Sequence, residues 1–321
     1  MANQETVLVT GGSGLLGATL VHQLVAEGQE KPVVLDINPT PTRLDDVSDQ
    51  VEYVVGDVGD PDVLHSVIGK TRPSKIYHFA AYLAEPCEKK PLEAVRINVE
   101  GFMHLLDEAR RHDVSQVLFS SSLGTYGLDL TDDDILNDKT LQRPLSMYGI
   151  TKLFAEGVGR FYKRKYGLDY RGIRYPAIVG PGVRATGYVT YTSAMIEFSA
   201  RGEPYTVTIE PSTQVPLVHV EDAARAMIML GRAPVENIKT ITYLINGVLP
   251  VPTAGEMAEI VQKRIPGAQI DFQPDPARQA VLKLSARLID DTCARQEWDW
   301  QPVYDTYEKL LDSYLAELQE K

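Results

Sequence analysis

A glycine-rich turn, Thr10–Gly17 (TGGSGLLG), constrains the fold more than any other segment of this 321-residue chain. It lies between a short apolar segment and a helical pattern. Gly11 permits a tight turn, Gly14 lets the backbone approach a bound group, and the last glycine allows close helix–strand packing. The unpaired amides of the first helical turn, from Leu15 and Leu16, then face an anion such as pyrophosphate. The turn therefore predicts a strand, a phosphate-binding loop and a helix, in that order.

An acidic residue follows at the distance expected for a nucleotide-binding βαβ unit. Asp36 ends the second predicted strand, 19 residues after Gly17. A carboxylate at this place accepts hydrogen bonds from the adenosine ribose hydroxyls and repels a 2′-phosphate. The next residues, Ile37-Asn38-Pro39, include no arginine that would hold such a phosphate. The turn and Asp36 together predict a dinucleotide site, with NAD rather than NADP as the cofactor.

Short apolar segments alternate with helical patterns through the first half of the chain. The segments are rich in Val and Ile and almost continuously apolar, as in strands that are buried on both faces. The predicted strands are Thr6–Thr10, Val33–Ile37, Val51–Val55, Lys75–Phe79 and Gln116–Ser120. The helices predicted between them are Leu15–Glu27, Pro61–Ile68 and Glu88–His112. This order predicts an α/β fold with a Rossmann-type doubly wound parallel sheet.

The second half of the chain has more irregular connections, rich in proline and glycine. The helices predicted there are Met147–Tyr166, Thr192–Arg201, Glu221–Gly231, Thr253–Arg264 and Tyr304–Leu318. The strands predicted there are Val215–His219, which returns to the sheet, and Ile241–Ile245. We expect an NAD-binding domain of residues 1–175, joined by 214–247. Residues 176–213 and 248–321 are expected to form a smaller, discontinuous C-terminal substrate lobe.

Composition excludes several classes of partner. The chain has 44 acidic and 32 basic side chains, and a net charge of −12 disfavours nucleic acid and anionic lipid. No window approaches the roughly 18 consecutive apolar residues of a membrane span. The N-terminal residues lack the basic region of a signal peptide, and two cysteines, Cys87 and Cys293, cannot form a disulfide framework. We therefore expect a cytoplasmic protein, and no metal site is predicted.

A Tyr-x-x-x-Lys pair, Tyr148 and Lys152, lies on the predicted helix Met147–Tyr166. The spacing alone is uninformative, because about 0.7 such pairs are expected by chance in this composition. However, positions i and i+4 share a helix face, and Ser120-Ser121-Ser122 ends the fifth strand at the ligand-binding edge of the sheet. In alcohol oxidation Tyr148 would take the hydroxyl proton, and the Lys152 ammonium and the nicotinamide charge would lower the phenol pKa. Ser122 would hold the substrate oxygen.

These motifs occur in the order found in the extended short-chain dehydrogenase/reductase (NAD-dependent epimerase/dehydratase) family, which the chain resembles over essentially its whole length. The matching segments are T-G-G-S-G-L-L-G (Thr10–Gly17), Asp36, Asp57-Val58, Ala80-Ala81, Asn98, S-S-S-L-G-T-Y-G (Ser120–Gly127), Tyr148/Lys152 and Arg174-Tyr175-Pro176. The ordered set is highly specific. The resemblance therefore implies both the fold and an NAD-dependent enzyme.

The same resemblance implies roles for single residues. Asp57 and Val58 would contact adenine, and Tyr175 would lie beside the nicotinamide. The residues that would line the cofactor are Phe79, Ala80 and Ala81. Asn98 would be structural or would contact the cofactor, and Ser122 matches the catalytic Ser/Thr position of the family.

Two branches of the family compete as models for the substrate. Nucleotide-sugar epimerases and dehydratases usually have Asn where this chain has Ala177 and Arg-Asp where it has Val215-Pro216. Ala and Val cannot bind a diphosphate, which counts against a nucleotide sugar. The chain is more similar to the L-threonine 3-dehydrogenase branch, through Arg174-Tyr175-Pro176, Val215-Pro216 and the tail Ile289–Pro302. That branch usually holds threonine with Gly-Thr-Thr, where this chain has Gly187-Tyr188-Val189, so threonine itself is not implied.

We expect an NAD-dependent dehydrogenase that oxidises a secondary alcohol of a small hydroxylated substrate. Arg184 and Thr186 are the candidate substrate contacts, because an arginine there would hold a carboxylate bidentately. The alternative is a sugar or nucleotide-sugar epimerase/dehydratase that keeps its NAD tightly bound. A redox sensor that only binds the dinucleotide would need no base, so the set of Ser122, Tyr148 and Lys152 argues against it.

Two of the predicted helices, Glu88–His112 and Met147–Tyr166, carry apolar residues beyond the face that a core requires. These residues include Phe102, Met103, Phe154 and Phe161. Two such helices per subunit can form a four-helix interface about a two-fold axis, the commonest closed symmetry. We therefore expect a homodimer, an arrangement that the family resemblance also implies.

Overall fold

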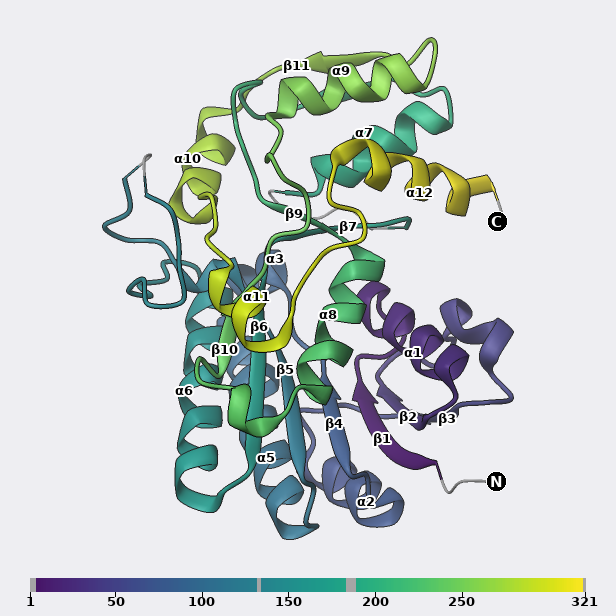
Figure 1. The fold of residues 1–321 in the computed structure, drawn as a ribbon, viewed down its shortest axis with the longest axis vertical. Helices are drawn as coiled ribbons and strands as arrows, with labels where there is room; N and C mark the ends of the chain where they lie inside the picture. Colours follow the sequence, from purple (N-terminus) through teal and green to yellow (C-terminus); the bar gives the residue numbers. More distant parts are fainter. Residues whose placement is uncertain (1–3, 132–133, 183–188, 320–321) are drawn as a thin grey trace.

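A computed structural model describes residues 4–131, 134–182 and 189–319 of the chain. Its centre is a seven-stranded, fully parallel sheet in the order β10-β6-β5-β4-β1-β2-β3. The strands are β1 (Glu5–Thr10), β2 (Glu30–Asp36), β3 (Glu52–Val55), β4 (Lys75–His78), β5 (Gln116–Ser122), β6 (Asp169–Tyr175) and β10 (Thr242–Leu244). The α/β, Rossmann-type fold predicted from the sequence is thus confirmed (Figure 1).

The direction in which strands are added reverses between β1 and β4, which lie side by side at the middle of the sheet. Strand β1 pairs with β2 on one side and with β4 on the other, and its last four residues are buried. At such a switch point the crossovers leave in opposite directions, so a crevice opens beyond the carboxyl ends of the strands. The sheet order therefore locates a ligand site at this edge.

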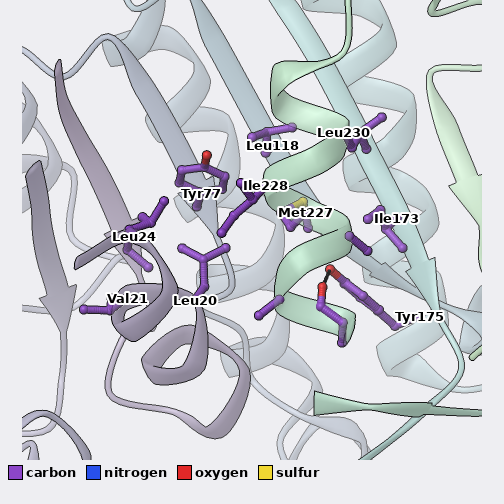
Figure 2. Packing of buried hydrophobic residues seen from close by; sticks show 14 of the residues in the cluster. Leu20, Val21, Leu24, Tyr77, Leu118, Ile173, Tyr175, Met227, Ile228 and Leu230 are labelled. Atoms are coloured by element: carbon purple, nitrogen blue, oxygen red, sulfur yellow. Dashed lines mark hydrogen bonds between the residues drawn. The ribbon is translucent and has the colours of Figure 1, made fainter. Parts of the chain in front are cut away.

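Helices cover both faces of the sheet. One face carries α1 (Leu15–Glu27) and α8 (Val220–Arg232), and the other carries α2 (Pro61–Thr71), α5 (Phe102–Arg111) and α6 (Met147–Tyr166). Figure 2 shows the first layer, in which leucines and valines of α1 and apolar residues of α8 pack on buried residues of β4, β5 and β6. The residues labelled there are Leu20, Val21, Leu24, Met227, Ile228, Leu230, Tyr77, Leu118, Ile173 and Tyr175.

A smaller lobe lies beyond the carboxyl edge of the sheet, at the top of Figure 1. Its core is formed by a separate hydrophobic cluster. Its elements are α7 (Tyr191–Ala200), α9 (Ala254–Arg264), α10 (Pro276–Ser285), α12 (Tyr307–Gln319), β7 (Ala177–Val179), β8 (Tyr205–Val207), β9 (Leu217–His219) and β11 (Ile270–Phe272). The strand expected at Val215–His219 does not return to the main sheet, because β9 pairs with β7 instead. The prediction for this strand was therefore wrong in its partner.

Helix α11 (Thr292–Trp298) lies outside the lobe cluster, although it falls within residues 248–321. Ala294, Trp298 and Trp300 pack into the main core on the α1/α8 face. The indole of Trp300 donates a hydrogen bond to the Asn246 carbonyl at 2.9 Å. The division of the chain into two domains stays a prediction, and this tail joins the larger core.

The helix expected over Glu88–His112 is not continuous. It comprises α3 (Ala84–Lys89), α4 (Pro91–Val95), a wider π turn at Arg96–Gly101, and α5. Pro91 has no amide to donate to the preceding turn, and Lys90 leaves helical geometry with φ −138° and ψ 71°. Within the three described ranges, no helix is both long and apolar enough to cross a lipid bilayer.

Candidate active site

A cleft of about 780 Å³ lies at the carboxyl edge of the sheet, where the switch point predicts it. Both the glycine turn and the Tyr–Lys pair border it. The predicted site residues that line it are Gly11, Gly14, Leu15, Leu16, Asp36, Asp57, Val58, Phe79, Ala80, Ala81, Ser122, Tyr148, Lys152 and Tyr175. One cleft thus brings together residues that are up to 164 positions apart in the chain.

The glycine turn leaves no room for a side chain at Gly11. This residue has φ +72°, and a Cβ on it would lie 2.6 Å from the backbone nitrogen of Ala80. Gly14 begins α1 with no side-chain cap, and the first turn of that helix contains no acidic residue. The amides and the positive dipole end of α1 are therefore not paired with a carboxylate from its own first turn. This leaves them available to bind a diphosphate.

Asp36 is held in place at the end of β2. One carboxylate oxygen accepts a hydrogen bond from the Ser13 amide at 2.9 Å, and the other accepts one from the Asn38 amide at 3.0 Å. The residue is 9% exposed and borders the cleft. Each oxygen keeps a further lone pair, so the fixed carboxylate can also accept the two hydroxyls of a ribose.

An ion-pair cluster borders the same end of the cleft. The Arg96 guanidinium donates to Asp57 at 2.7 Å and to Glu93 at 2.6 Å. These hydrogen bonds raise the pKa of Arg96 further above its usual value, and the pKa of Glu93 is lowered by the same arginine. Arg96 could not be predicted as a site residue, because no motif in the sequence marks it and Asp57 is 39 residues away in the chain.

Ser122 and Tyr148 meet because α6 packs closely on the turn that follows β5. Ser146 caps α6 by accepting a hydrogen bond from the Gly149 amide at 3.0 Å. A side chain on Gly149 would collide with the carbonyl of Gly124, so glycine is required for this approach. Tyr148 and Ser122 both line the cleft here, and the interaction with the Ser122 side chain opposes the effect of burial on the Tyr148 pKa.

Lys152 lies one helical turn beyond Tyr148 and is almost completely buried. Its ammonium donates to the Ser120 carbonyl at 2.6 Å and lies 5.6 Å from the centre of the Tyr148 ring. Burial lowers the pKa of Lys152 to about 8. The predicted face-sharing of the pair is therefore confirmed.

The expected lowering of the Tyr148 pKa does not hold for the protein alone. Burial raises the pKa of Tyr148 well above its usual value, the charge interaction with Cys87 adds to this rise, and the Ser122 hydrogen bond reduces it. The physical reason is that the phenol lies in a site with little water, where the charged form is penalised.

The three serines that end β5 all border the cleft but make different contacts. The buried Ser121 hydroxyl donates to Glu156 at 2.6 Å, whereas the Ser122 hydroxyl accepts a hydrogen bond from the Gly124 amide at 3.0 Å and interacts with Tyr148. The backbone carbonyl of Ser120 accepts the hydrogen bond from Lys152 described above. Ser122 is therefore the serine placed to meet a ligand beside Tyr148.

Asn98 is not among the residues that line the cleft, and its contacts fit the structural one of its two expected roles. Its side chain accepts from the Tyr82 amide at 2.7 Å and donates to the Tyr82 carbonyl at 2.9 Å and to Thr151 at 3.1 Å. It therefore fastens the loop after β4 to α6. Tyr175 does line the cleft, and its hydroxyl donates to the Ala223 carbonyl at 2.8 Å (Figure 2).

Comparisons with known proteins decide the family. The family model described as "NAD dependent epimerase/dehydratase family" matches residues 7–245. The chain belongs to this family. It is 30% identical over 306 residues to the mitochondrial L-threonine 3-dehydrogenase of Sus scrofa, covering 95% of this chain and 80% of that protein.

Two solved structures are similar over nearly the whole fold. The holo form of a GalE-like L-threonine dehydrogenase from Cupriavidus necator has a TM-score of 0.89 and 28% identity, covering 98% of this chain and 99% of that one. The L-threonine dehydrogenase of Phytophthora infestans has a TM-score of 0.89, 29% identity and the same coverages. The chain is thus a member of an NAD-dependent enzyme family, and the holo neighbour places a nucleotide cofactor within this fold.

The residues that the lobe contributes to the cleft are mostly apolar. They are Ala177, Ile178, Val189 and Thr190, and Leu83 from the start of α3 also lines the cleft. The two candidate substrate contacts, Arg184 and Thr186, lie outside the described residues.

Proposed function

We propose that the protein is an NAD-dependent oxidoreductase that oxidises a secondary alcohol of a small hydroxylated substrate. One observation carries the proposal: Ser122, Tyr148 and Lys152 gather at the same cleft that the glycine turn and Asp36 border. A dinucleotide on the glycine turn with its ribose at Asp36 has its reactive ring directed toward the rest of this cleft. The family membership supports the same cofactor class.

The three side chains divide the acid–base work. NAD supplies the hydride acceptor when it is bound. Ser122 donates a hydrogen bond to the substrate oxygen, and the Tyr148 oxygen receives the hydroxyl proton. The Lys152 ammonium favours the phenolate by charge, which opposes the effect of burial on the Tyr148 pKa. In the reverse direction Tyr148 returns the proton to the carbonyl oxygen.

The proposed choice of NAD over NADP rests on Asp36. Its carboxylate is fixed by the amides of Ser13 and Asn38, so it cannot turn away from a 2′-phosphate without losing both hydrogen bonds. Repulsion between two anions at hydrogen-bonding distance then disfavours NADP.

The apolar residues of the cleft and the named relatives both favour a small substrate. Ala177 and Ile178 provide no donor for a diphosphate, which disfavours a nucleotide sugar. The relatives named above are L-threonine dehydrogenases at about 30% identity, and we propose a substrate of the same class, a small polar secondary alcohol. We propose the cytoplasm as its compartment, because Cys87 and Cys293 are both free thiols.

The test is to mix purified protein with NAD and panels of hydroxy-amino acids, hydroxy acids and sugars, and to follow NADH absorbance. We expect at least one small secondary alcohol to give turnover that Tyr148→Phe lowers by about 10²–10⁴-fold while NAD still binds. The alternative, an epimerase, predicts protein that co-purifies with NAD and converts a sugar with no net NADH. That outcome would overturn the dehydrogenase proposal.

A further inference from the structure

Three potential metal ligands meet where α2 packs on α5. His65 lies on α2, while Glu108 lies on α5 and His112 directly follows that helix. Helix α2 is at the lower end of the molecule in Figure 1, far from the lobe. The members of this His65–Glu108–His112 cluster do not line the cleft described above, so the proposed dehydrogenase chemistry makes no use of them.

The three side chains already converge on one point. Nδ1 of His65 lies 2.9 Å from Oε2 of Glu108, and Nε2 of His112 lies 3.2 Å from the same oxygen. All three ligand atoms lie within 4.8 Å of one another. Tetrahedral zinc, with bonds of about 2.0–2.1 Å, needs ligand atoms roughly 3.4 Å apart. Small side-chain rotations would therefore bring all three ligands into position.

Local spacing on α5 and the packing of α2 on α5 produce this arrangement. Glu108 and His112 are four residues apart, which places them on one side of α5. The His112 ring also lies against Gly69 of α2, where a Cβ would be 3.4 Å from it, so the packing of the two helices keeps this imidazole beside Glu108. Arg111 donates to Oε1 of Glu108 at 3.2 Å and leaves Oε2 to the two histidines.

His112 is the group that a metal would satisfy. Its two ring nitrogens are buried and form no hydrogen bond within the described part of the chain, despite the 3.2 Å approach to Glu108. A buried polar atom without a partner costs free energy, and such atoms in a native protein call for a ligand, an ion or a water. A metal ion bound to Nε2 would use the free lone pair.

We propose that His65, Glu108 and His112 bind a divalent transition-metal ion, with Zn²⁺ as the best match. Two imidazoles and one carboxylate are zinc ligands, and three protein ligands leave a fourth position for water. The His65 side chain is 67% exposed, so that position opens to solvent. The nearby Arg111 guanidinium repels the ion, which makes this site weaker than a closed four-ligand site. The ion would join α2 to α5 and stabilise the fold.

The test uses untagged protein that has been stripped of metal with a chelator. Zn²⁺ binding is measured by competition with a chromophoric chelator, and Co²⁺ is added to record the visible spectrum of a tetrahedral site. We expect one ion per chain, at least tenfold weaker binding in His65→Ala, and a melting temperature that rises with Zn²⁺ in the parent but not in His65→Ala. His65 is exposed, so this variant should fold. Its thermal unfolding without metal, compared with that of the parent, tests whether it does.

The matched control is His104→Ala. Like His65, His104 is exposed, but it lies on α5 and is not part of the cluster. It should bind Zn²⁺ as the parent does. Equal binding by the parent and His65→Ala, or no binding at Zn²⁺ concentrations equal to that of the protein, would overturn the proposal. These measurements need no substrate, so their failure would leave the proposed dehydrogenase function untouched.

Discussion

The phenol of Tyr148 lies beside Ser122 with its pKa raised by burial, so in the protein alone it keeps its proton at neutral pH. Tyr148→Phe removes this hydroxyl while it changes little volume. Folding and NAD binding should persist, and turnover should fall by about 10²–10⁴-fold, the usual loss with a general base. Steady-state kinetics with an active substrate, together with NAD titration by calorimetry, measure both effects. Near-parental turnover in the variant would show that another group takes the proton.

Lys152 should set the pH at which this phenol becomes a base. The oxidative rate should rise with pH through an apparent pKa below that of Tyr148 in the protein alone, because the ammonium and the bound cofactor favour the phenolate. In Lys152→Met the ammonium is lost, so the profile should move to higher pH by at least about one unit. Lys165→Met, an exposed lysine of the same helix, is the control. An unshifted profile in Lys152→Met would contradict the charge argument.

Asp36 should decide between the two nicotinamide cofactors. We expect NAD to bind at least tenfold more tightly than NADP, which corresponds to about 1.4 kcal/mol. Asp36→Ala should narrow this ratio, because it removes both the ribose acceptor and the anion that repels the 2′-phosphate. The dissociation constants of NAD and NADP, measured for the parent and the variant, give this ratio. Asp49→Ala, which changes an exposed aspartate, is the control. Equal constants in the parent would refute the assignment.

The residues that could be predicted are those whose signal is local in the chain. The glycine turn, Asp36 and the pair Tyr148/Lys152 each depend on spacing along one loop or one helix. Arg96 and the His65–Glu108–His112 cluster depend on which helices pack together, and His65 is 43 residues from Glu108. The effect of burial on the Tyr148 pKa could not be predicted for the same reason, because burial is a property of the packed molecule.

At the scale of single elements, α6 was predicted from end to end, whereas the helix expected over Glu88–His112 was not. Helix α6 has a capping serine at its start, and Lys163, Arg164 and Lys165 in its last turn suit the helix dipole. The other segment contains Pro91, which ends one helix and starts the next. The partner of β9 could not be predicted, because a short apolar strand fits either sheet equally well.

Helix α6 is also tied to β6 through a buried ion pair. Glu156 accepts hydrogen bonds from Arg174 at 2.8 and 3.0 Å and from Ser121 at 2.6 Å. Glu156→Ala would leave Arg174 buried without this partner. We expect it to lower the free energy of unfolding by about 3–5 kcal/mol at pH 7, the usual cost of breaking a buried pair. Denaturant unfolding measures this, and Glu259→Ala on an exposed face of α9 should change little.

The same pair should make stability depend on pH in a defined direction. Burial alone would raise the pKa of Glu156, but hydrogen bonds from Arg174 and Ser121 outweigh it and hold the pKa below its usual value. A carboxyl with a lowered pKa contributes stability above its unfolded pKa, about 4.3, and loses it as the pH falls. The difference between the parent and Glu156→Ala should therefore shrink below about pH 4. A difference that stays constant down to pH 3 would contradict this account.

At the scale of the whole molecule, the sheet order and the position of the cleft follow from the strand–helix alternation. The pairing of two chains depends instead on which apolar side chains remain exposed. Phe102 was expected at an interface, but it is fully buried in the core between α5 and the sheet. Met103, Phe154 and Phe161 do remain exposed, at 41%, 46% and 43%. Three of the four residues of the interface prediction are thus exposed, whereas Phe102 packs on the rings of Phe119 and Tyr170 in the core.

We propose that two copies of the chain pair through α6 and α5. Ile150, Phe154 and Phe161 lie exposed on α6, and a Cβ on Gly157 would meet nothing within 4 Å, so a partner helix can approach closely there. Burying such residues removes apolar surface from water, which stabilises the pair by roughly 25 cal/mol per Å².

Light scattering at micromolar concentration should give about twice the chain mass of 35.6 kDa. Phe154→Asp should give the single-chain mass, because an unpaired charge would be buried at the interface. Val303→Asp, on an exposed segment before α12, should leave the dimer intact. A parent that scatters as a monomer would show that this face meets some other partner or only water.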